Sequence, residues 1–340
     1  MIIATVEKLE EALSNPMQAD VEAMRALDGD ILILGVGGKM GPSLAKLARR
    51  AAEAGGTRKR IIGVARFSDH TLQTKLQAAG VETIAMDLME PDALHRLPDV
   101  QNVVFMAAKK FGTSSAEHET WAMNTYLPGR VAERFRESRI VAFSTGNVYP
   151  LQPVGQGGAT EDTPVSPVGE YAQSALGRER MFEYAAARWG TQVAILRLNY
   201  AVELRYGVLV DIGRAVYERR PVDLRMGLVN VIWQRDANAI CLRSFAYCDS
   251  PPAIFNVTGP ETLSVRYIAE RFGKKLGIEP VFSSEESDSA LLNNAAKAHQ
   301  LFGYPSVTPG EVIDWLAAWI AAKKPLLNKP THFETRDGKF

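Results

Sequence analysis

The sequence predicts an α/β protein in which a doubly wound parallel sheet supports a smaller C-terminal α/β lobe. Short, fully apolar segments are spaced as strands, and amphipathic segments of helical length alternate with them. A glycine-rich turn follows the first of these strand segments. Buried strands of a parallel sheet form continuous apolar runs, and regular alternation with helices implies right-handed crossovers.

The composition limits the classes of partner. The chain has 340 residues, of which 46% are hydrophobic and 23% charged, and its formal net charge is zero. This balance gives no electrostatic reason to expect nucleic acid or an anionic membrane as a partner. We find neither an apolar run of the roughly 20 residues that a membrane span needs nor a signal-peptide pattern. With two cysteines and scattered histidines, we expect a cytoplasmic protein without a metal site.

The N-terminal region, residues 1–28, is predicted to be a helical appendage. Its apolar residues have helical spacing in two segments, which Asn15-Pro16 separates. Residues 29–198 are predicted to form the sheet domain. We expect its strands at residues 31–34, 61–65, 82–86, 102–106, 140–144 and 192–198. We expect its helices at residues 42–54, 68–79, 91–97, 117–135 and 170–189.

The second half of the chain has a looser pattern. Residues 199–330 mix short strand segments, turns and two helical segments, 265–276 and 309–322. Open α/β sheets bind ligands at the carboxyl ends of their strands. We therefore expect these residues to form mainly a substrate-binding lobe over that edge, with some segments returning to the sheet. Residues 331–340 are expected to be a tail.

The glycine-rich turn is the strongest motif. Gly35, Gly38 and Gly41 have the spacing G-x-x-G-x-x-G, with Lys39 and Met40 between them, and the turn joins the first strand to the first long helix. Glycine lets the backbone turn sharply and approach a ligand, and the helix N-terminus offers N–H groups to phosphate. The motif predicts a Rossmann-like, NAD(P)-binding domain. The alternative is a glycine-rich turn without a ligand.

The segment after the second strand bears on the choice of dinucleotide. An acidic residue there suits the ribose hydroxyls of NAD, whereas an arginine suits the 2′-phosphate of NADP. Here Arg66 follows the strand, although Asp69 lies close by. We therefore expect NADP slightly more than NAD. Asp87 and Leu88 follow the third strand, where they would meet the adenine.

Further segments resemble the NAD-dependent epimerase/dehydratase branch of the extended short-chain dehydrogenase/reductase family. The resemblance covers about residues 30–322 and rests on several segments in the family's order: the glycine turn, Asp87-Leu88, residues 106–108, Asn124, residues 143–149, residues 169–171 and residues 255–259. It implies that Ala107, Ala108 and Asn124 lie along the cofactor. It also implies that Thr145 and Tyr171 are catalytic, and that helices 117–135 and 170–189 form a homodimer interface.

The sequence departs from the family's Y-x-x-x-K pattern, because Ala175 stands four residues after Tyr171. In the family that lysine lowers the pKa of the tyrosine, as a nearby cation favours the phenolate. Lys109 and Lys110 follow the fourth strand, and Arg178 lies two helical turns beyond Tyr171. We hypothesise that Lys109 or Lys110 takes the role of the missing Y-x-x-x-K lysine, and Lys110 is our first candidate. The alternative is that both are solvated loop residues.

A second departure concerns the substrate. Val229 stands where family members that use nucleotide sugars have an arginine for the substrate diphosphate. Arg225 or Arg235 is a candidate replacement, because a bidentate arginine suits a diphosphate. A free sugar or sugar acid becomes a comparable alternative. We expect the substrate to meet Arg225 and three further residues, namely Asn147, Asn199 and Glu203, the last as a candidate base for dehydration.

The resemblance implies an NAD(P)-dependent oxidoreductase of the epimerase/dehydratase type. Its substrate would be a sugar or sugar derivative that reacts at a hydroxyl or keto centre, with Tyr171 exchanging the proton and Thr145 orienting the oxygen. The missing lysine keeps a second hypothesis open. In that hypothesis the chain is an NAD(P)-binding sensor or regulator with a degenerate active site.

Overall fold

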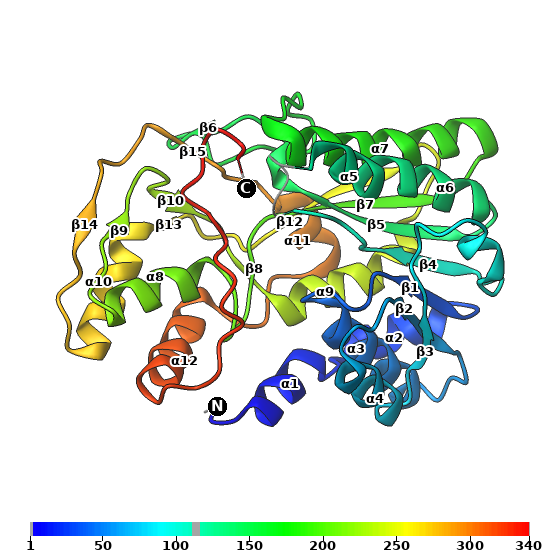
Figure 1. Ribbon diagram of the computed structural model, residues 1–340, viewed down its shortest axis with the longest axis horizontal. Helices are drawn as coiled ribbons and strands as arrows, with labels where there is room; N and C mark the ends of the chain where they lie inside the picture. The colour runs from blue at the N-terminus through cyan, green and yellow to red at the C-terminus, as the bar shows by residue number, and fades with distance from the viewer. Residues whose placement is uncertain (1–2, 111–115, 340) are drawn as a thin grey trace.

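The computed structural model describes residues 3–110 and 116–339. Its centre is a seven-stranded sheet with the order β12-β7-β5-β4-β1-β2-β3, in which all neighbouring strands run parallel (Figure 1). The strands are β1 (Ile31–Leu34), β2 (Ile61–Ala65), β3 (Glu82–Ala85), β4 (Asn102–Phe105), β5 (Arg139–Thr145), β7 (Val193–Leu198) and β12 (Ala253–Val257). The predicted doubly wound parallel sheet is confirmed.

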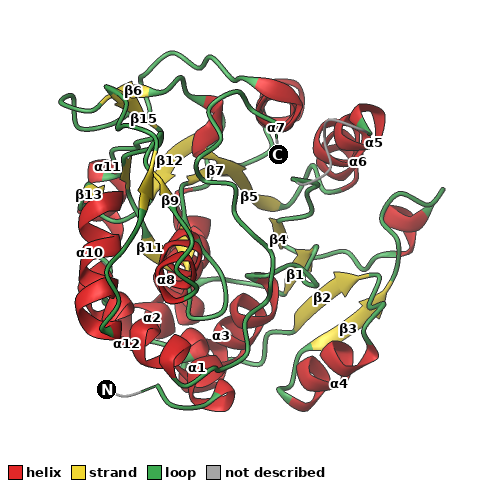
Figure 2. Ribbon diagram, turned by 60° about the vertical axis from the view of Figure 1, so that its left-hand side comes forward, coloured by secondary structure: helices red, strands yellow, loops and turns green. Residues whose placement is uncertain are grey.

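Helices cover both faces of the sheet, which explains the continuous apolar strands. Successive side chains of a strand point to opposite faces. Accordingly Ile31 and Ile33 join one core and Leu32 and Leu34 the other. The first core is closed by α3 (Gly41–Ala54) and α9 (Gln234–Arg243), and the second by α6 (Leu127–Arg134) and α7 (Gly169–Trp189) (Figure 2). The edge strand β3 carries α4 (His70–Ala78).

Two predicted helices differ in detail from the sequence expectation. The helix expected over 117–135 is divided into α5 (Glu117–Trp121), a π-helical turn η2 (Ala122–Tyr126) and α6. Pro128 lies in the first turn of α6, and proline has no N–H to give to the preceding turn. The local change of helical winding is consistent with that missing donor. The helix expected over 91–97 is one 3₁₀ turn, η1 (Ala93–Arg96).

The N-terminal region forms two helices, α1 (Val6–Ser14) and α2 (Gln18–Ala26). Helix α2 packs on α3 and α9, and Met24 belongs to the sheet core. Asp20 of α2 is fully buried and accepts hydrogen bonds from Arg235 and Arg243, the latter at 2.7 Å. The appendage is therefore bound into the domain by a buried ion-pair cluster as well as by apolar contacts.

The lobe has its own apolar core around α8 (Val208–Tyr217), α10 (Val265–Leu276) and α12 (Pro309–Ala321). Three two-stranded pairs complete it: β8 (Ala201–Val202) with β11 (Ile232–Trp233), β9 (Val222–Asp223) with β14 (Phe282–Ser283), and β10 (Leu228–Val229) with β13 (Leu263–Ser264). Between these segments the chain returns to the sheet as α9, β12 and α11 (Ala296–Phe302). Within the described residues, no helix has the length and apolar character needed to cross a membrane.

The last described residues, 323–339, form an extended C-terminal segment that runs from α12 across the front of the lobe towards α7 (Figure 1). Thr331 and Phe333 of the expected tail are buried. Near its end, Gly338 meets the start of α7 so closely that a Cβ on Gly338 would lie 2.2 Å from the carbonyl oxygen of Val168. The segment therefore connects the lobe to the beginning of α7.

Candidate active site

The glycine turn between β1 and α3 is shaped by close backbone contacts. Gly35 has a φ of +93°, and a Cβ there would lie 2.6 Å from the amide nitrogen of Ala107. A Cβ on Gly41 would lie 2.2 Å from the carbonyl oxygen of Val36. At Gly38 the nearest atom would be 3.5 Å away, so protein packing does not fill that side of the turn. A space beside the α3 N-terminus that only glycine leaves open fits the phosphate bridge of a dinucleotide.

The charged residue at the end of β2 is Arg66, whose side chain is exposed. Asp69 instead caps α4 by accepting a hydrogen bond of 2.9 Å from the amide of Thr71. After β3, Asp87 accepts 2.9 Å from the amide of Met89, and Leu88 is buried. Arg66 is thus an exposed cation just after β2, whereas Asp69 is engaged as a helix cap.

Asn124 fixes the loop after β4. Its buried amide group accepts from the backbone N–H of Lys109 at 2.8 Å and donates to the carbonyl of the same residue at 2.9 Å. It also donates to the hydroxyl of Ser174 on α7 at 3.0 Å. Asn124 therefore ties the loop that contains Ala107 and Ala108 to the helix of Tyr171.

Thr145 and Tyr171 are brought into each other's neighbourhood by the fold. Thr145 ends β5, Tyr171 lies in the first turn of α7, and the Thr145 side chain acts on the Tyr171 phenol to lower its pKa. Asn147 orients Thr145, because its backbone and side-chain N–H groups donate to Thr145 Oγ1 at 3.2 and 3.0 Å. Burial raises the pKa of Tyr171 above its ordinary value of 10, while Arg178 and Thr145 act in the opposite direction.

Arg178 is the buried cation on the Tyr171 helix. Its guanidinium donates to the carbonyl of Phe143 at 2.7 Å and to Asn124 Oδ1 at 3.1 Å. Its Nε has no hydrogen-bond partner among the described residues. Ala175, at the family's lysine position, is fully buried in a small apolar cluster. The positive charge on this helix thus lies one turn further along than in the Y-x-x-x-K pattern.

The two candidate lysines have different surroundings. The Lys109 ammonium forms an ion pair with Glu119. Lys110 Nζ lies 5.7 Å from the ring centroid of Tyr171. Burial lowers the pKa of Lys110 to about 8. Of the two, Lys110 is the one that lies near the tyrosine ring.

The expected substrate residues do not form one group. Asn199 is buried and donates to the carbonyl of Leu291 at 3.3 Å. Glu203 is buried and accepts from Arg205 Nε at 3.1 Å. Arg225 is exposed and pairs with Asp223 at 2.7 Å. Arg235 is buried against Asp20, so it is not a candidate for a substrate clamp.

A buried polar network behind Thr145 was not predicted. Arg197 of β7 pairs with Glu179 of α7 at 2.7 Å and donates to the phenol oxygen of Tyr149 at 2.7 Å. Tyr149 in turn donates to Asn256 Oδ1 at 3.0 Å. The only sequence signal is the presence of charged residues at buried positions of a strand and a helix. The network connects β5, β7, β12 and α7 beneath the site.

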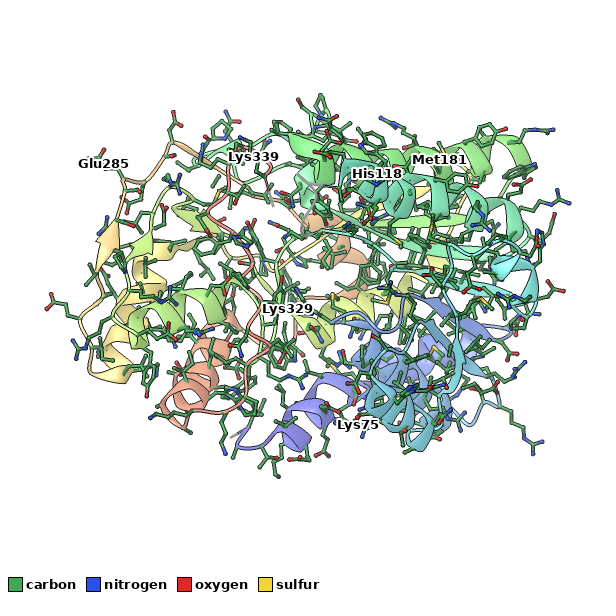
Figure 3. All side chains as sticks on the ribbon, in the orientation of Figure 1. Lys75, His118, Met181, Glu285, Lys329 and Lys339 are labelled. Carbon is green, nitrogen blue, oxygen red and sulfur yellow. The ribbon has the colours of Figure 1, made fainter. Side chains whose placement is uncertain are left out.

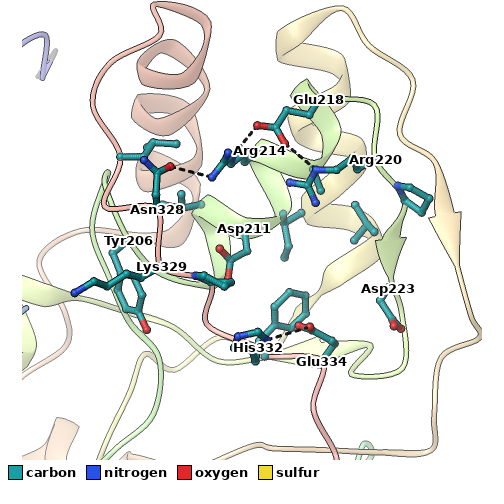
Figure 4. A pocket seen from close by; sticks show the side chains of 18 of the residues that line it. Tyr206, Asp211, Arg214, Glu218, Arg220, Asp223, Asn328, Lys329, His332 and Glu334 are labelled. Atoms are coloured by element: carbon teal, nitrogen blue, oxygen red, sulfur yellow. Dashed lines mark hydrogen bonds and ion pairs between the residues drawn. The ribbon is translucent and has the colours of Figure 1, made fainter. Parts of the chain in front are cut away.

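A cavity of about 360 Å³ lies between α8 and the C-terminal segment (Figure 4). Its lining includes Tyr206, Asp211, Arg214, Lys329 and His332. The backbone and hydroxyl of Thr331 donate to Asp211 Oδ2 at 2.8 and 2.6 Å. Burial raises the pKa of Tyr206, and Asp211 and Tyr171 act on it in the same direction. Tyr206 thus links the cavity electrostatically to Tyr171.

The family model "NAD dependent epimerase/dehydratase family" matches residues 31–202, more than half of the chain. This segment contains the glycine turn, Thr145 and Tyr171. No curated protein matches the chain.

Solved structures share the fold at low sequence identity. UDP-glucuronic acid 4-epimerase from Bacillus cereus, in complex with UDP-glucuronic acid and NAD, has a TM-score of 0.72 at 17% identity, and the match covers 86% of this chain and 99% of that chain. UDP-glucose 4-epimerase from Thermotoga maritima, with UDP-glucose, has a TM-score of 0.71 at 16% identity, and the match covers 86% of this chain and 99% of that chain. dTDP-glucose 4,6-dehydratase from Streptomyces venezuelae, with NAD and TYD, has a TM-score of 0.72 at 17% identity, and the match covers 86% of this chain and 97% of that chain.

Proposed function

We propose that this chain, which belongs to the NAD-dependent epimerase/dehydratase family, uses a nicotinamide dinucleotide for redox chemistry. The reaction would take place at a hydroxyl or keto centre of a sugar-type substrate. The observation that supports the proposal most is the placing of Thr145, at the end of β5, near Tyr171, in the first turn of α7. This pair lies in the same fold as the open glycine turn at the start of α3.

The dinucleotide would be held by the turn from Gly35 to Gly41, with its bridge at the N-terminus of α3. Ala107 and Ala108 would lie along it, and Asp87 with Leu88 would meet its adenine end. When bound, its nicotinamide ring supplies the acceptor or donor of a hydride. Two of the three solved structures described above contain NAD, and the third contains UDP-glucose. NADP remains our proposal for this chain on the basis of Arg66.

Tyr171 is assigned the proton transfer. In the oxidation direction its phenolate takes the proton of the substrate hydroxyl, and in the reduction direction the phenol returns it. Thr145 donates to the same substrate oxygen and keeps it in line with Tyr171. Arg178 favours the phenolate, because a nearby positive charge lowers the pKa of a phenol. Lys110 is a second cation at the ring of Tyr171.

The replacement of the lysine by Ala175 favours a second candidate function, an NAD(P)-binding sensor. Burial opposes ionisation of Tyr171, and a tyrosine that stays neutral is a poor base. Such a protein would bind the dinucleotide and turn over no sugar. The two functions therefore differ in turnover and agree in cofactor binding.

The test has two steps. Fluorescence titration with NADH and NADPH measures cofactor binding, and a panel of sugars, sugar acids and nucleotide sugars is then assayed by nicotinamide absorbance. We expect Tyr171→Phe to lose about 10²- to 10⁴-fold in turnover, the usual contribution of general acid–base catalysis, with cofactor affinity retained. Tyr184→Phe is the matched control, because Tyr184 is an exposed tyrosine of the same helix. Dinucleotide binding without turnover on the whole panel would favour the sensor, and loss of both would exclude the proposal.

We also propose a homodimer through α5, α6 and α7. These helices and the turn η2 between α5 and α6 expose large side chains, namely Trp121, Tyr126 and Tyr184. Exposed aromatic groups on neighbouring helices are typical of protein–protein contacts. Light scattering after gel filtration would measure the mass, and a monomer at micromolar concentration would contradict the dimer.

A further inference from the structure

We infer that the C-terminal segment, residues 323–339, determines which substrates this protein accepts. The segment closes the cavity beside α8 to a space for one uncharged sugar or polyol, and it excludes a sugar that carries a nucleoside diphosphate. The inference rests on the proposed function and deepens it, because it chooses between the free sugar and the nucleotide sugar that the sequence leaves open.

The first half of the segment is fixed to the lobe. The backbone N–H of Leu327 donates to the carbonyl of Arg205 at 3.0 Å. The backbone and hydroxyl of Thr331 donate to one carboxylate oxygen of Asp211, at 2.8 and 2.6 Å. Phe333 is buried in the apolar core of the lobe. These contacts hold the segment against α8, so that it forms a wall and not a loose tail.

The second half of the segment crosses from the lobe to the sheet domain. Arg336 donates to the carbonyl and the hydroxyl of Ser289 at 2.7 and 2.8 Å, and to the carbonyl of Arg225 at 3.1 Å. Gly338 then meets Val168, directly before α7. The segment therefore also contacts the start of the helix that carries the proposed proton-transfer residue.

The segment forms one wall of the cavity of about 360 Å³. Residues 326, 328–330 and 332–334 line the cavity, and most of the other lining residues belong to α8 and to residues 220–223. Figure 4 shows Asn328, Lys329, His332 and Glu334 along the segment, with Asp211 of α8 beside them. Figure 3 shows Lys329 at the centre of the molecule. Without the segment the cavity would lose this wall, so the segment sets its size.

The volume of the cavity suits one sugar. Ligand pockets of proteins measure about 300–1,000 Å³, and the cavity of about 360 Å³ lies near the lower end of that range. A nucleotide sugar carries a nucleoside and two phosphates besides its sugar, and it is therefore much bulkier than the sugar alone. It does not fit while the segment holds its place.

The charged residues that line the cavity are balanced in sign. Glu218 pairs with Arg214 at 2.6 Å and with Arg220 at 2.7 Å. Asp223 pairs at 2.7 Å with Arg225, which lies outside the lining. The lining has four basic and four acidic residues, namely Arg205, Arg214, Arg220 and Lys329, and Asp211, Glu218, Asp223 and Glu334. Such a lining offers a ligand hydrogen-bond donors as well as acceptors.

The remaining charges do not favour an anion. Arg205 is paired with Glu203 at 3.1 Å, and Glu334 lies 3.9 Å from His332 Nδ1. Burial raises the pKa of Asp211, and the charge of Glu334 acts in the same direction, whereas hydrogen bonds and His332 oppose it. A diphosphate would add negative charge beside these carboxylates. A hydroxyl group can donate to a carboxylate and accept from a guanidinium or ammonium group, so an uncharged polyol suits this lining.

Tyr206 connects the cavity with the proposed cofactor site. Its side chain lines the cavity, and Lys39 Nζ of the glycine turn lies 3.2 Å from its ring centroid. Lys39 itself is not part of the lining. Burial raises the pKa of Tyr206, and Asp211 and Tyr171 add to this effect. A sugar held in the cavity is therefore on the side of the lobe that faces the glycine turn.

Calorimetry on the intact protein, saturated with NADH or NADPH, tests the inference. The uncharged probes are glucose, galactose and myo-inositol, the anionic probe is glucuronate, and the nucleotide sugar is UDP-glucose. We expect at least one uncharged probe to bind about tenfold more tightly than UDP-glucose and glucuronate, a factor of ten being about 1.4 kcal/mol. A smaller preference, or binding of no uncharged probe, would overturn the inference.

Two variants assign the preference to the segment. Arg336→Ala and Thr331→Val each remove an anchor of the wall, and neither residue lines the cavity. We expect both to bind UDP-glucose about tenfold more tightly than the wild type does, and so to lose most of the preference. Arg271→Ala is the matched control, because Arg271 donates to another carbonyl of the lobe, that of Gly310, at 3.1 Å and is not part of the lining.

The outcomes separate the inference from the proposed function. Circular dichroism establishes that each variant is folded, and a wild-type preference in both folded variants would overturn the inference. Turnover of UDP-glucose by the wild type would also overturn it and leave the proposed function intact. Failure to bind both NADH and NADPH would instead refute the proposed function.

Discussion

At the scale of single residues, the site differs from the Y-x-x-x-K pattern in where its positive charge lies. Ala175 stands at the lysine position, and Arg178 is the buried cation on the same helix. The sequence predicts Thr145 and Tyr171 as partners, and the first ends a strand while the second begins a helix. It proposes Lys109 or Lys110 as the replacement for the missing lysine and notes Arg178 two helical turns beyond Tyr171. Which of them lies against the ring and which is buried beneath depends on side-chain packing that the pattern does not encode.

Arg178 offers a prediction about pH. Arg178 lowers the pKa of Tyr171, so its removal should raise that pKa. In the oxidation direction Tyr171 acts as a base, and a higher pKa moves the rising limb of kcat/KM to higher pH. We expect this alkaline displacement in Arg178→Met and a profile near that of the wild type in Arg178→Lys, which keeps the charge. Profiles of kcat/KM between pH 6 and pH 10 measure this displacement, since the ordinary pKa of a tyrosine is about 10.

Circular dichroism must show that both Arg178 variants remain folded, since the side chain is buried. A folded Arg178→Met protein with an unchanged profile would contradict the electrostatic role. Its hydrogen bonds to Phe143 and Asn124 would then be its whole contribution.

Arg66 offers a prediction about cofactor choice. The structure leaves its side chain exposed at the end of β2, while Asp69 is used as a helix cap. If Arg66 binds a 2′-phosphate, Arg66→Ala should weaken NADPH binding about tenfold, the magnitude of one charge-assisted contact, and leave NADH unaffected. Arg58→Ala, another exposed arginine, is the control. Equal losses for both dinucleotides, or none, would be the contrary result in a fluorescence titration.

At the scale of elements, continuous apolar segments predicted the strands well because both faces of the sheet are covered. The helix over 117–135 was predicted too simply, since its apolar spacing does not reveal the π turn before Pro128. Helices α1 and α2 were visible from their spacing. Their attachment was not, because Asp20 meets Arg235 and Arg243 from more than 200 residues away.

This attachment can be measured. Asp20→Ala leaves two arginines without their buried carboxylate, and breaking a buried ion pair from one side typically costs about 3–5 kcal/mol. We expect a loss of that size in the free energy of unfolding, determined with urea. Glu22→Ala, an exposed acid on the same helix, should change it by less than about 0.5 kcal/mol. If the two variants were equally stable, α2 would be held by apolar contacts alone.

At the scale of the whole molecule, the sequence predicted a sheet domain followed by a lobe. It did not predict the course of residues 323–339, which were expected to end in a tail. Long-range contacts hold them in place: Leu327 donates to the carbonyl of Arg205 at 3.0 Å, and Arg336 donates to the carbonyl of Ser289 at 2.7 Å. For the same reason the approach of Lys39 to Tyr206 had no signal in the sequence.

The docking of this segment on α7 depends on Gly338. Its φ is +73°, and a Cβ would lie 2.2 Å from the carbonyl oxygen of Val168. We expect Gly338→Ala to release the end of the segment, so that trypsin cleaves faster after Arg336. Gly155→Ala is the control, because a Cβ on Gly155 would meet no atom within 4 Å. Mass spectrometry of the digests follows the cleavage, and equal rates in the two variants would show that the segment is held elsewhere.

The return of α9 and β12 to the sheet has a consequence for protein engineering. The lobe is not formed by one continuous stretch of sequence. The chain leaves the lobe to add the edge strand β12 beside β7 and then returns to the lobe. Exchange of a C-terminal block between relatives would therefore replace that strand together with the ligand-facing residues, and a mismatched register would leave the edge of β7 bare. Specificity in this architecture is better transplanted by point substitutions than by chimeras.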